Sequence, residues 1–244
     1  MIFSIITICY NSEESISSTL WSVRSQTFKK YEHIIIDGGS TDNTLGLIKS
    51  ISPDSKLISE ADGGIYDAIN KGISLATGNL VVLLHSGDQF HSYNTLESIV
   101  KVVDYEKINL FSVEYFKGDR KVRYYDIFNW QLKNFELGMM PPHLGMIIPR
   151  KFYTEYGSYL LKYSIASDFE LSFRYLYIHR IPFIKHSFSI VKMSIGGVSS
   201  SGINSIITIT KEIKDILSNA NIDYTLKAFF QKTLLRLKEF IRIY

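Results

Sequence analysis

The chain has 244 residues, of which 45% are hydrophobic and 21% are charged, and a formal net charge of +3. This length is enough for one substantial core, and so small a positive charge gives no reason to expect nucleic-acid binding. The single cysteine, Cys9, excludes a disulfide within the chain and a CxxC metal site. No run reaches the ~18 apolar residues of a membrane span, and residues 1–11 show neither a basic region nor a cleavage site. We therefore expect a cytoplasmic protein, soluble or peripheral to a membrane.

The first half alternates β-branched runs with helical patterns. Strands are predicted at residues 2–9, 31–37, 56–59 and 80–84, and helices at residues 11–24, 40–52 and 65–76. Asn11 is expected to cap the first helix, with Glu14 completing a capping box, and Ser40 or Asp42 to cap the second. This alternation predicts a mostly parallel sheet with helices on both faces.

The pattern is less regular beyond Asp88. Helices are predicted at residues 95–104, 166–177, 205–218 and 224–243, and strands at residues 109–115, 121–125, 145–149, 181–186 and 190–193. The Gly118-Asp119 pair predicts a hairpin turn between two of these strands. Residues 196–202 form a loop rich in glycine and serine, which is expected to act either as a mobile lid over a diphosphate or as a linker.

Two apolar strands each end in an aspartate. Residues 34–36 lead into Asp37, and residues 80–84 lead into His85-Ser86-Gly87-Asp88. Ligands bind beyond the carboxyl ends of the strands in an open α/β sheet, so these positions predict a site for a nucleotide and a metal. Mg²⁺ and Mn²⁺ take oxygen ligands and often only one or two protein carboxylates. The alternative for either aspartate is a purely structural role in its turn.

Several motifs follow one another in a fixed order. They are Ser4–Thr7 with Tyr10-Asn11, Asp37–Asp42, Glu60–Gly72, Ala76–Gly78, Ser86–Asp88, Ala166–Glu170 and Gly196–Ser199. Over roughly residues 1–200 the chain resembles a family 2 glycosyltransferase with the GT-A fold, similar to the branch that builds bacterial surface polysaccharides of the colanic acid and O-antigen type. The resemblance implies an α/β, Rossmann-like fold with a mostly parallel sheet flanked by helices. Residues 1–115 would bind a nucleotide sugar, residues 116–203 would form the acceptor and catalytic half, and residues 204–244 would form amphipathic C-terminal helices.

The resemblance also implies roles for the donor site. Asp37 would accept a hydrogen bond from the nucleotide base, which favours a UDP-sugar over a GDP-sugar, while Gly38 stands where the family usually carries a second aspartate. Asp62 and Lys71 would face the nucleotide sugar, although Lys71 also suits a surface ion pair with Asp67. The expected donor-binding residues are Thr7, Tyr10, Asn11, Asp37, Asp62, Asn70, Lys71, Ser86 and Gly87.

Metal and catalytic roles are implied in the same way. Asp88 would bind Mn²⁺ or Mg²⁺ with the donor's diphosphate, while His85 and Gly87 replace further aspartates of the family pattern. Asp168 would be the general base, unless Ser167 or Asp168 merely caps a helix, and Glu170 is the alternative base. The remaining, weaker candidates are His85, His143, Gly197 and Ser199.

The implied reaction is the inverting transfer of a single sugar to a lipid-linked saccharide, in the biosynthesis of O-antigen lipopolysaccharide, capsule or exopolysaccharide. The chain lacks the Gln-x-x-Arg-Trp motif of processive synthases. The basic, amphipathic segment 224–244 could lie on the inner face of the bacterial cytoplasmic membrane or could pack on the core. A non-enzymatic nucleotide-sugar binding module remains an alternative. A sugar nucleotidyltransferase is disfavoured because residues 1–20 contain no glycine.

Overall fold

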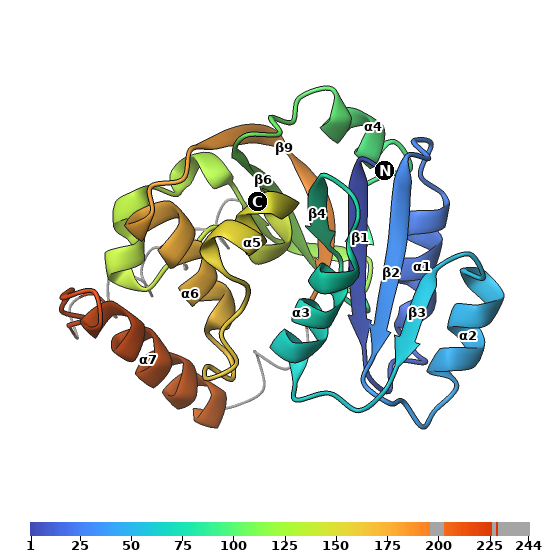
Figure 1. The fold of residues 1–244 in the computed structure, drawn as a ribbon, viewed down its shortest axis with the longest axis horizontal. Coiled ribbons are helices and arrows are strands. Elements are labelled where there is room, and N and C mark those ends of the chain that lie inside the picture. The colour runs from blue at the N-terminus through green and yellow to red at the C-terminus, as the bar shows by residue number, and fades with distance from the viewer. Residues whose placement is uncertain (196–202, 226–227, 229–244) are drawn as a thin grey trace.

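A computed structural model of the chain describes residues 1–195, 203–225 and 228. In these residues nine strands form one sheet in the order β3-β2-β1-β4-β8-β6-β9-β5, with β7 paired to β6 (Figure 1). The strands are β1 (Phe3–Cys9), β2 (Tyr31–Asp37), β3 (Lys56–Ser59), β4 (Leu80–Leu83), β5 (Gln89–Phe90), β6 (Ile108–Lys117), β7 (Arg120–Tyr125), β8 (Met146–Pro149) and β9 (Phe183–Ser194).

Helices cover both faces of the sheet, as the alternation of elements predicts. They are α1 (Ile16–Arg24), α2 (Thr44–Ile51), α3 (Ile65–Leu75), α4 (Thr95–Val100), α5 (Arg150–Tyr156), α6 (Ser167–Phe173) and α7 (Ile203–Ser218), with the 3₁₀ helices η1 (Ile127–Asn129), η2 (Leu132–Leu137) and η3 (His143–Gly145) and the π-helix η4 (Arg174–Ile178). Ile36 of β2 packs in one apolar cluster with Ile69 of α3. Its neighbour Ile35 packs in another with Leu20 of α1 and Ile48 of α2, because successive side chains of a strand point to opposite faces.

The first four strands run parallel, so their carboxyl ends meet at one edge of the sheet. Cys9 of β1 lies opposite Asp37 of β2, and Asp37 lies opposite Ser59 of β3. β4 runs parallel to β1 on its other side. The predicted α/β fold with a largely parallel sheet is therefore confirmed, and the loops after β1, β2, β3 and β4 stand side by side.

The rest of the sheet is mixed. β8 is antiparallel to both β4 and β6, and β6 with β7 forms the predicted hairpin. β9 runs parallel to β6 from Ile108↔Phe183 to Phe116↔Ser194 and also pairs with β5 through Gln89↔Lys192. The far end of β9 therefore lies beside the turn that contains Asp88.

Several predicted boundaries were wrong. Asn11 does not cap the first helix, because its φ of 43° turns the chain and α1 begins only at Ile16. The second helix begins after Asn43 rather than after Ser40 or Asp42, although Asp42 Oδ1 accepts a hydrogen bond of 3.0 Å from the Thr44 amide.

Other differences concern the second half. α4 ends at Val100 rather than at residue 104, and the two strands predicted at residues 181–193 are one strand, β9, with shifts in its register opposite Phe111–Val113. The helix predicted at residues 166–177 is α6 continued by the π-helix η4. α5 was not predicted. The helix predicted at residues 224–243 lies mostly outside the described residues.

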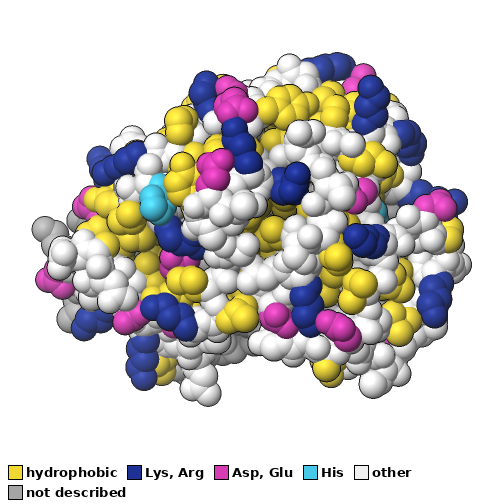
Figure 2. All heavy atoms as spheres, viewed as in Figure 1, with side chains coloured by type: hydrophobic (Ala, Val, Ile, Leu, Met, Phe, Trp, Pro, Cys, Tyr) yellow, Lys and Arg dark blue, Asp and Glu magenta, His cyan; other side chains and the backbone are white. Residues whose placement is uncertain are grey.

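The surface seen in Figure 2 mixes both signs of charge, with Lys and Arg side chains interspersed among Asp and Glu. In the part of the chain that the structure describes, no helix combines the length and the apolar character needed to cross a membrane.

Candidate active site

Three loops meet at the tips of β1, β2 and β3. A Cβ atom added to Gly38 would lie 2.8 Å from Asp62 Oδ2 and 3.4 Å from Tyr10 Cδ2, so Gly38 packs between these two side chains. Asp62 thus occupies the space that a side chain at position 38 would need. The Tyr10 ring is 62% exposed, which leaves it accessible to a ligand at this edge.

Asp37, the last residue of β2, is fully buried. Its Oδ2 accepts hydrogen bonds from the amides of Gly39 and Ser40 and from Ser59 Oγ, and its Oδ1 accepts one of 2.5 Å from Ser40 Oγ. Burial alone would raise the pKa of this carboxyl, but the hydrogen bonds from Ser40 and Ser59 outweigh it and hold the pKa below its usual range. Asp37 is therefore ionised, and its hydrogen bonds hold the turn after β2 in place. Its contact with a nucleotide base stays a prediction.

Thr7 and Asn11 hold this region together. Thr7 is buried, and its Oγ1 lies 3.0 Å from Nε2 of the buried His33. Asn11 Oδ1 accepts a hydrogen bond of 2.9 Å from the Thr41 amide, which joins the β1 loop to the β2 loop. Both side chains thus already have structural partners within the fold, and their contacts with a donor stay predictions.

Ion pairs join residues of α3 to one another and to the loop before the helix. Lys71 Nζ lies 2.9 Å from Glu60 and 3.3 Å from Asp67, so the expected pair one turn apart is present. Asn70 exchanges hydrogen bonds with Tyr159, donating to its carbonyl at 2.9 Å and accepting from its amide at 3.0 Å. Asn70 therefore ties α3 to the segment before α6, and its contact with a donor stays a prediction.

The turn from β4 to β5 holds Asp88 firmly in place. Asp88 is 8% exposed, and its Oδ1 accepts a hydrogen bond of 2.9 Å from the Ser194 amide of β9. Thr19 of α1 accepts from the Gly87 amide and donates to the Asp88 carbonyl. Ser86 Oγ lies 2.9 Å from Ser15 Oγ, and the φ of 91° at Gly87 favours glycine there. Burial raises the pKa of the Asp88 carboxyl to about 7.

The residues around Asp88 fit a metal that is shared with phosphate. Within the described ranges no donor bonds to Asp88 Oδ2, and no three His, Cys, Asp or Glu side chains gather as a metal cluster. The His85 ring lies 5.8 Å from the His143 ring, and its buried Nδ1 has no hydrogen-bond partner. Burial lowers the pKa of His85 to about 3 and that of His143 to about 4, so both rings are neutral. One carboxylate with phosphate oxygens suits Mg²⁺ or Mn²⁺.

A chain of rings leads from this turn to Asp168. His143 Nε2 lies 2.8 Å from the Tyr159 hydroxyl, and the Tyr159 ring stacks on Tyr66 at 5.7 Å between centroids. Tyr66 Oη is 3.3 Å from Asp168 Oδ1, which also accepts a hydrogen bond of 2.7 Å from the Phe169 amide. Burial raises the pKa of Asp168 to about 6, although these two hydrogen bonds partly oppose the effect of burial.

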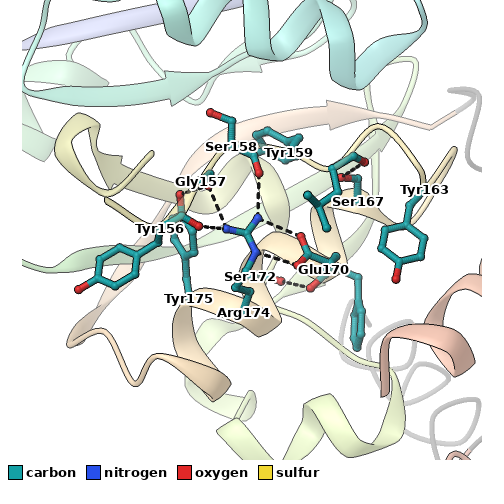
Figure 3. A network of polar contacts seen from close by, with 12 residues as sticks. Tyr156, Gly157, Ser158, Tyr159, Tyr163, Ser167, Glu170, Ser172, Arg174 and Tyr175 are labelled. Carbon is teal, nitrogen blue, oxygen red and sulfur yellow. Dashed lines mark hydrogen bonds and ion pairs between the residues drawn. The ribbon is translucent and has the colours of Figure 1, made fainter. Parts of the chain in front are cut away.

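Glu170, the alternative base, lies in an ion pair. Its two oxygens accept hydrogen bonds of 2.7 and 3.0 Å from Arg174, and its side chain is buried. The same guanidinium also donates to the carbonyls of Tyr156, Gly157 and Ser158, as Figure 3 shows. Glu170 therefore holds the Arg174 guanidinium, which in turn binds residues 156–158. These contacts favour a structural role for Glu170 over that of general base.

Some site residues escaped the sequence reasoning. Tyr66 lies within the motif Glu60–Gly72, but no role was predicted for it, and Tyr159 gave no local signal at all. Glu212 of α7 accepts hydrogen bonds from residues 164–166, just before Asp168. Its signal is an acidic residue within the apolar stripe Ile209, Ile213 and Ile216. Gly197 and Ser199 lie outside the described residues.

Sequence comparison finds relatives among glycosyltransferases. The family model described as "Glycosyl transferase family 2" matches residues 4–154. An uncharacterized glycosyltransferase of Mycobacterium tuberculosis is 33% identical over 178 residues, which are 70% of this chain and 67% of the relative. A PGL/p-HBAD biosynthesis glycosyltransferase of Mycobacterium bovis is 28% identical over 70% of this chain and 68% of its own length.

Solved structures of the same kind share the fold. TarS of S. aureus, crystallised as residues 1–349 with UDP-GlcNAc, superposes with a TM-score of 0.72 at 20% identity over 92% of this chain and 68% of that one. The mannosyltransferase PcManGT of Pyrobaculum calidifontis, in complex with GDP-Man and Mn²⁺, gives a TM-score of 0.64 at 19% identity over 91% of this chain and 64% of that one. The expected GT-A fold is therefore confirmed, and with the family match over residues 4–154 the chain belongs to glycosyltransferase family 2.

Proposed function

We propose that this protein transfers one sugar, with inversion, from a nucleotide-diphosphate sugar to a hydroxyl of a lipid-linked saccharide. The observation that carries the proposal is Asp168. Its carboxylate stands at the start of α6, is held by the Tyr66 hydroxyl and the Phe169 amide, and has a pKa of about 6. Such a group is ionised at neutral pH and is more basic than an ordinary aspartate, as a general base requires.

The proposed chemistry is a single displacement. Asp168 accepts the proton of the acceptor hydroxyl while that oxygen attacks the anomeric carbon from the face opposite the diphosphate. The bond from the anomeric carbon to the diphosphate oxygen breaks, and its electron pair leaves with the nucleoside diphosphate. A divalent metal bound at Asp88 would offset the negative charge on that leaving group. An α-linked donor would therefore give a β-linked product.

The donor is proposed to lie across the tips of β1–β4. Tyr10 and Asp62 would flank it on one side, and the turn that holds Asp88 would flank it on the other. TarS binds UDP-GlcNAc and PcManGT binds GDP-Man, so relatives of this fold accept different bases. We expect a UDP-sugar from the residue pattern at Asp37. Since Asp37 is already saturated with hydrogen bonds, UDP- and GDP-sugars should be tested side by side.

The lipid-linked acceptor is proposed from the tail of the sequence and from the relatives. The M. bovis relative is named for PGL/p-HBAD biosynthesis. The tail brings basic residues and phenylalanines together, at Lys227, Phe229, Phe230, Lys232, Arg236, Lys238, Phe240 and Arg242. Each basic residue near anionic lipid contributes about 1 kcal/mol of attraction. We propose that this segment brings the enzyme to the inner face of a bacterial membrane where surface polysaccharide is made.

A two-part experiment tests the proposal. Thermal-shift measurements with UDP- and GDP-sugars, with and without Mn²⁺, identify the donor, because a ligand of the folded state raises the melting temperature. Release of nucleoside diphosphate is then measured with lipid-linked acceptors, and the anomeric configuration of the product is read by NMR. Donor binding without release of nucleoside diphosphate in the presence of any acceptor would favour a binding module. Release of pyrophosphate from a nucleoside triphosphate would favour a nucleotidyltransferase. An α-linked product from an α-linked donor would refute inversion.

A further inference from the structure

The segment between α5 and α6 carries Tyr159 and leads into α6, whose second residue is Asp168. Different contacts hold its two ends. Arg174 binds the carbonyls of residues 156–158, as Figure 3 shows, and Asn70 pairs with the Tyr159 backbone. Ser167 Oγ donates a hydrogen bond of 2.8 Å to the Leu160 carbonyl, which closes the segment on itself. None of these contacts involves residues 164–166, the last three residues before α6.

Glu212 holds them. This residue belongs to α7, which packs against α6 (Figure 1). Its Oε1 accepts hydrogen bonds of 2.8 Å from both the amide and the hydroxyl of Ser164. Its Oε2 accepts 3.0 Å from the Ile165 amide and 2.8 Å from the Ala166 amide. These three amides precede α6, whose N-cap is Ala166, so they lack partners from a regular helix, and one carboxylate satisfies all three.

The same contacts lead to Asp168 through Tyr66. The Ile165 carbonyl accepts a hydrogen bond of 2.5 Å from the Tyr66 hydroxyl, and this hydroxyl is 3.3 Å from Asp168 Oδ1. Glu212 therefore fixes both the peptide that orients Tyr66 and the chain two residues before the carboxylate. The match to the family model ends at residue 154, so α7 lies in a region beyond the family pattern.

We propose that Glu212 is a positioning residue for Asp168, through which α7 holds the catalytic carboxylate in its working orientation. The inference rests on the proposed role of Asp168 as the general base. Glu212 itself does not contact substrate. Its substitution is expected to lower turnover while leaving the donor site, at the tips of β1–β4, unchanged.

The test compares Glu212→Gln with a matched control, Asp215→Asn. The glutamine keeps the shape of the side chain but can offer only one accepting oxygen to the three amides. Asp215 lies one turn along the same helix and accepts a hydrogen bond of 2.8 Å from the Tyr163 hydroxyl, so the control also removes a charge that faces this segment. Two measurements are made on the full chain: amide hydrogen exchange of residues 160–170, and transfer kinetics with the donor that the thermal-shift screen identifies.

In Glu212→Gln we expect the amides of residues 164–166 to exchange about tenfold faster or more, as the loss of a charge-assisted hydrogen bond predicts. We expect kcat to fall by about the same factor with the donor KM unchanged. Asp215→Asn should leave both unchanged. The proposal would be overturned if Glu212→Gln showed the exchange rates and kcat of the wild type, or if Asp215→Asn lost as much protection and turnover as Glu212→Gln. A loss of donor affinity in Glu212→Gln would also overturn it.

Hydrogen exchange also separates this inference from the proposed function. If the wild-type protein transfers no sugar and the exchange of residues 164–166 still rises in the variant, the proposed reaction fails while the contact role of Glu212 stands. If Glu212→Gln does not fold, Glu212→Asp, which keeps the charge on a shorter side chain, is measured in its place. A rise in exchange along the whole chain, rather than at residues 164–166, would assign Glu212 to general stability and refute a positioning role.

Discussion

Removing the charge of Asp168 should make the protein more stable at neutral pH. Burial raises the pKa of this carboxyl from 3.8 to about 6. A tenfold change in a proton-binding constant corresponds to about 1.4 kcal/mol, so ionised Asp168 costs the fold up to about 3 kcal/mol. Because the side chain keeps some exposure, we expect Asp168→Asn to raise the free energy of unfolding by about 1–3 kcal/mol at pH 8. The amide oxygen can still accept from Phe169 and Tyr66.

The sign of the pH dependence follows from proton binding. Between about pH 4 and pH 6 the folded wild-type protein binds more protons at Asp168 than the unfolded chain does, so its stability falls as pH rises through this window. Above about pH 7 both states are ionised and the loss is complete. The variant lacks this slope, so the difference between the two proteins should be near zero at about pH 4 and greatest at about pH 8.

Urea denaturation of both proteins at several pH values measures this difference. Asp215→Asn, at an exposed position of α7 where the amide oxygen can still accept from Tyr163, is the control and should change stability by less than about 0.5 kcal/mol. Turnover of Asp168→Asn should fall by ~10² or more, with donor affinity nearly intact. A variant that is less stable than the wild type at pH 8 would refute the assignment of Asp168 as a desolvated base, and so would a collapse of donor affinity.

Three further substitutions test other parts of the site. Asp88→Asn should remove most Mn²⁺-dependent donor binding in thermal-shift assays and most activity, and full activity of the variant or of the enzyme in EDTA would contradict the metal role. Glu170→Gln should lower the free energy of unfolding by on the order of 3 kcal/mol, because it breaks the buried pair with Arg174; a stable protein that has lost turnover would instead identify Glu170 as the base. Gly38→Asp should lower the melting temperature, since its Cβ would displace Asp62 Oδ2 and its carboxylate would stand beside that of Asp62; a wild-type melting temperature would show that Asp62 moves aside without cost and would refute the prediction.

The sequence was most informative where structure is local. The apolar runs predicted β1, β2 and β4 to within about a residue, because a strand buried on both faces shows as a continuous apolar run. The short strand β3, which is half-exposed, was predicted with the same bounds. Boundaries failed where distant contacts decide the backbone. Asn11 is of a residue type that often caps helices. Its side chain instead accepts a hydrogen bond from the Thr41 amide of the neighbouring loop, and α1 begins only at Ile16.

The residues of the candidate site also differ in whether the sequence alone could identify them. Asp88 and Asp168 could be chosen from motifs, since each carboxylate stands at the end of a strand or the start of a helix. Tyr159 and Glu212 could not, because their roles depend on contacts with residues far away in the chain, namely His143 and Asn70 for the first and residues 164–166 for the second. Hydrophobic periodicity marks Glu212 as an acidic residue on an apolar helix face, but it does not identify the residues that Glu212 contacts.

The place of β8 in the sheet limits how new specificities can be engineered. β8 follows β6 and β7 in the chain but lies between β4 and β6, pairing with β4 through Leu80↔Pro149 and Val81↔Ile148. A chimera that fuses the first half of one enzyme to the second half of another must therefore recreate this pairing across its new junction. A mismatch there would leave the edge of β4 unpaired, which invites aggregation. Recombination of whole halves is thus a poorer route to altered products than substitutions made within one chain.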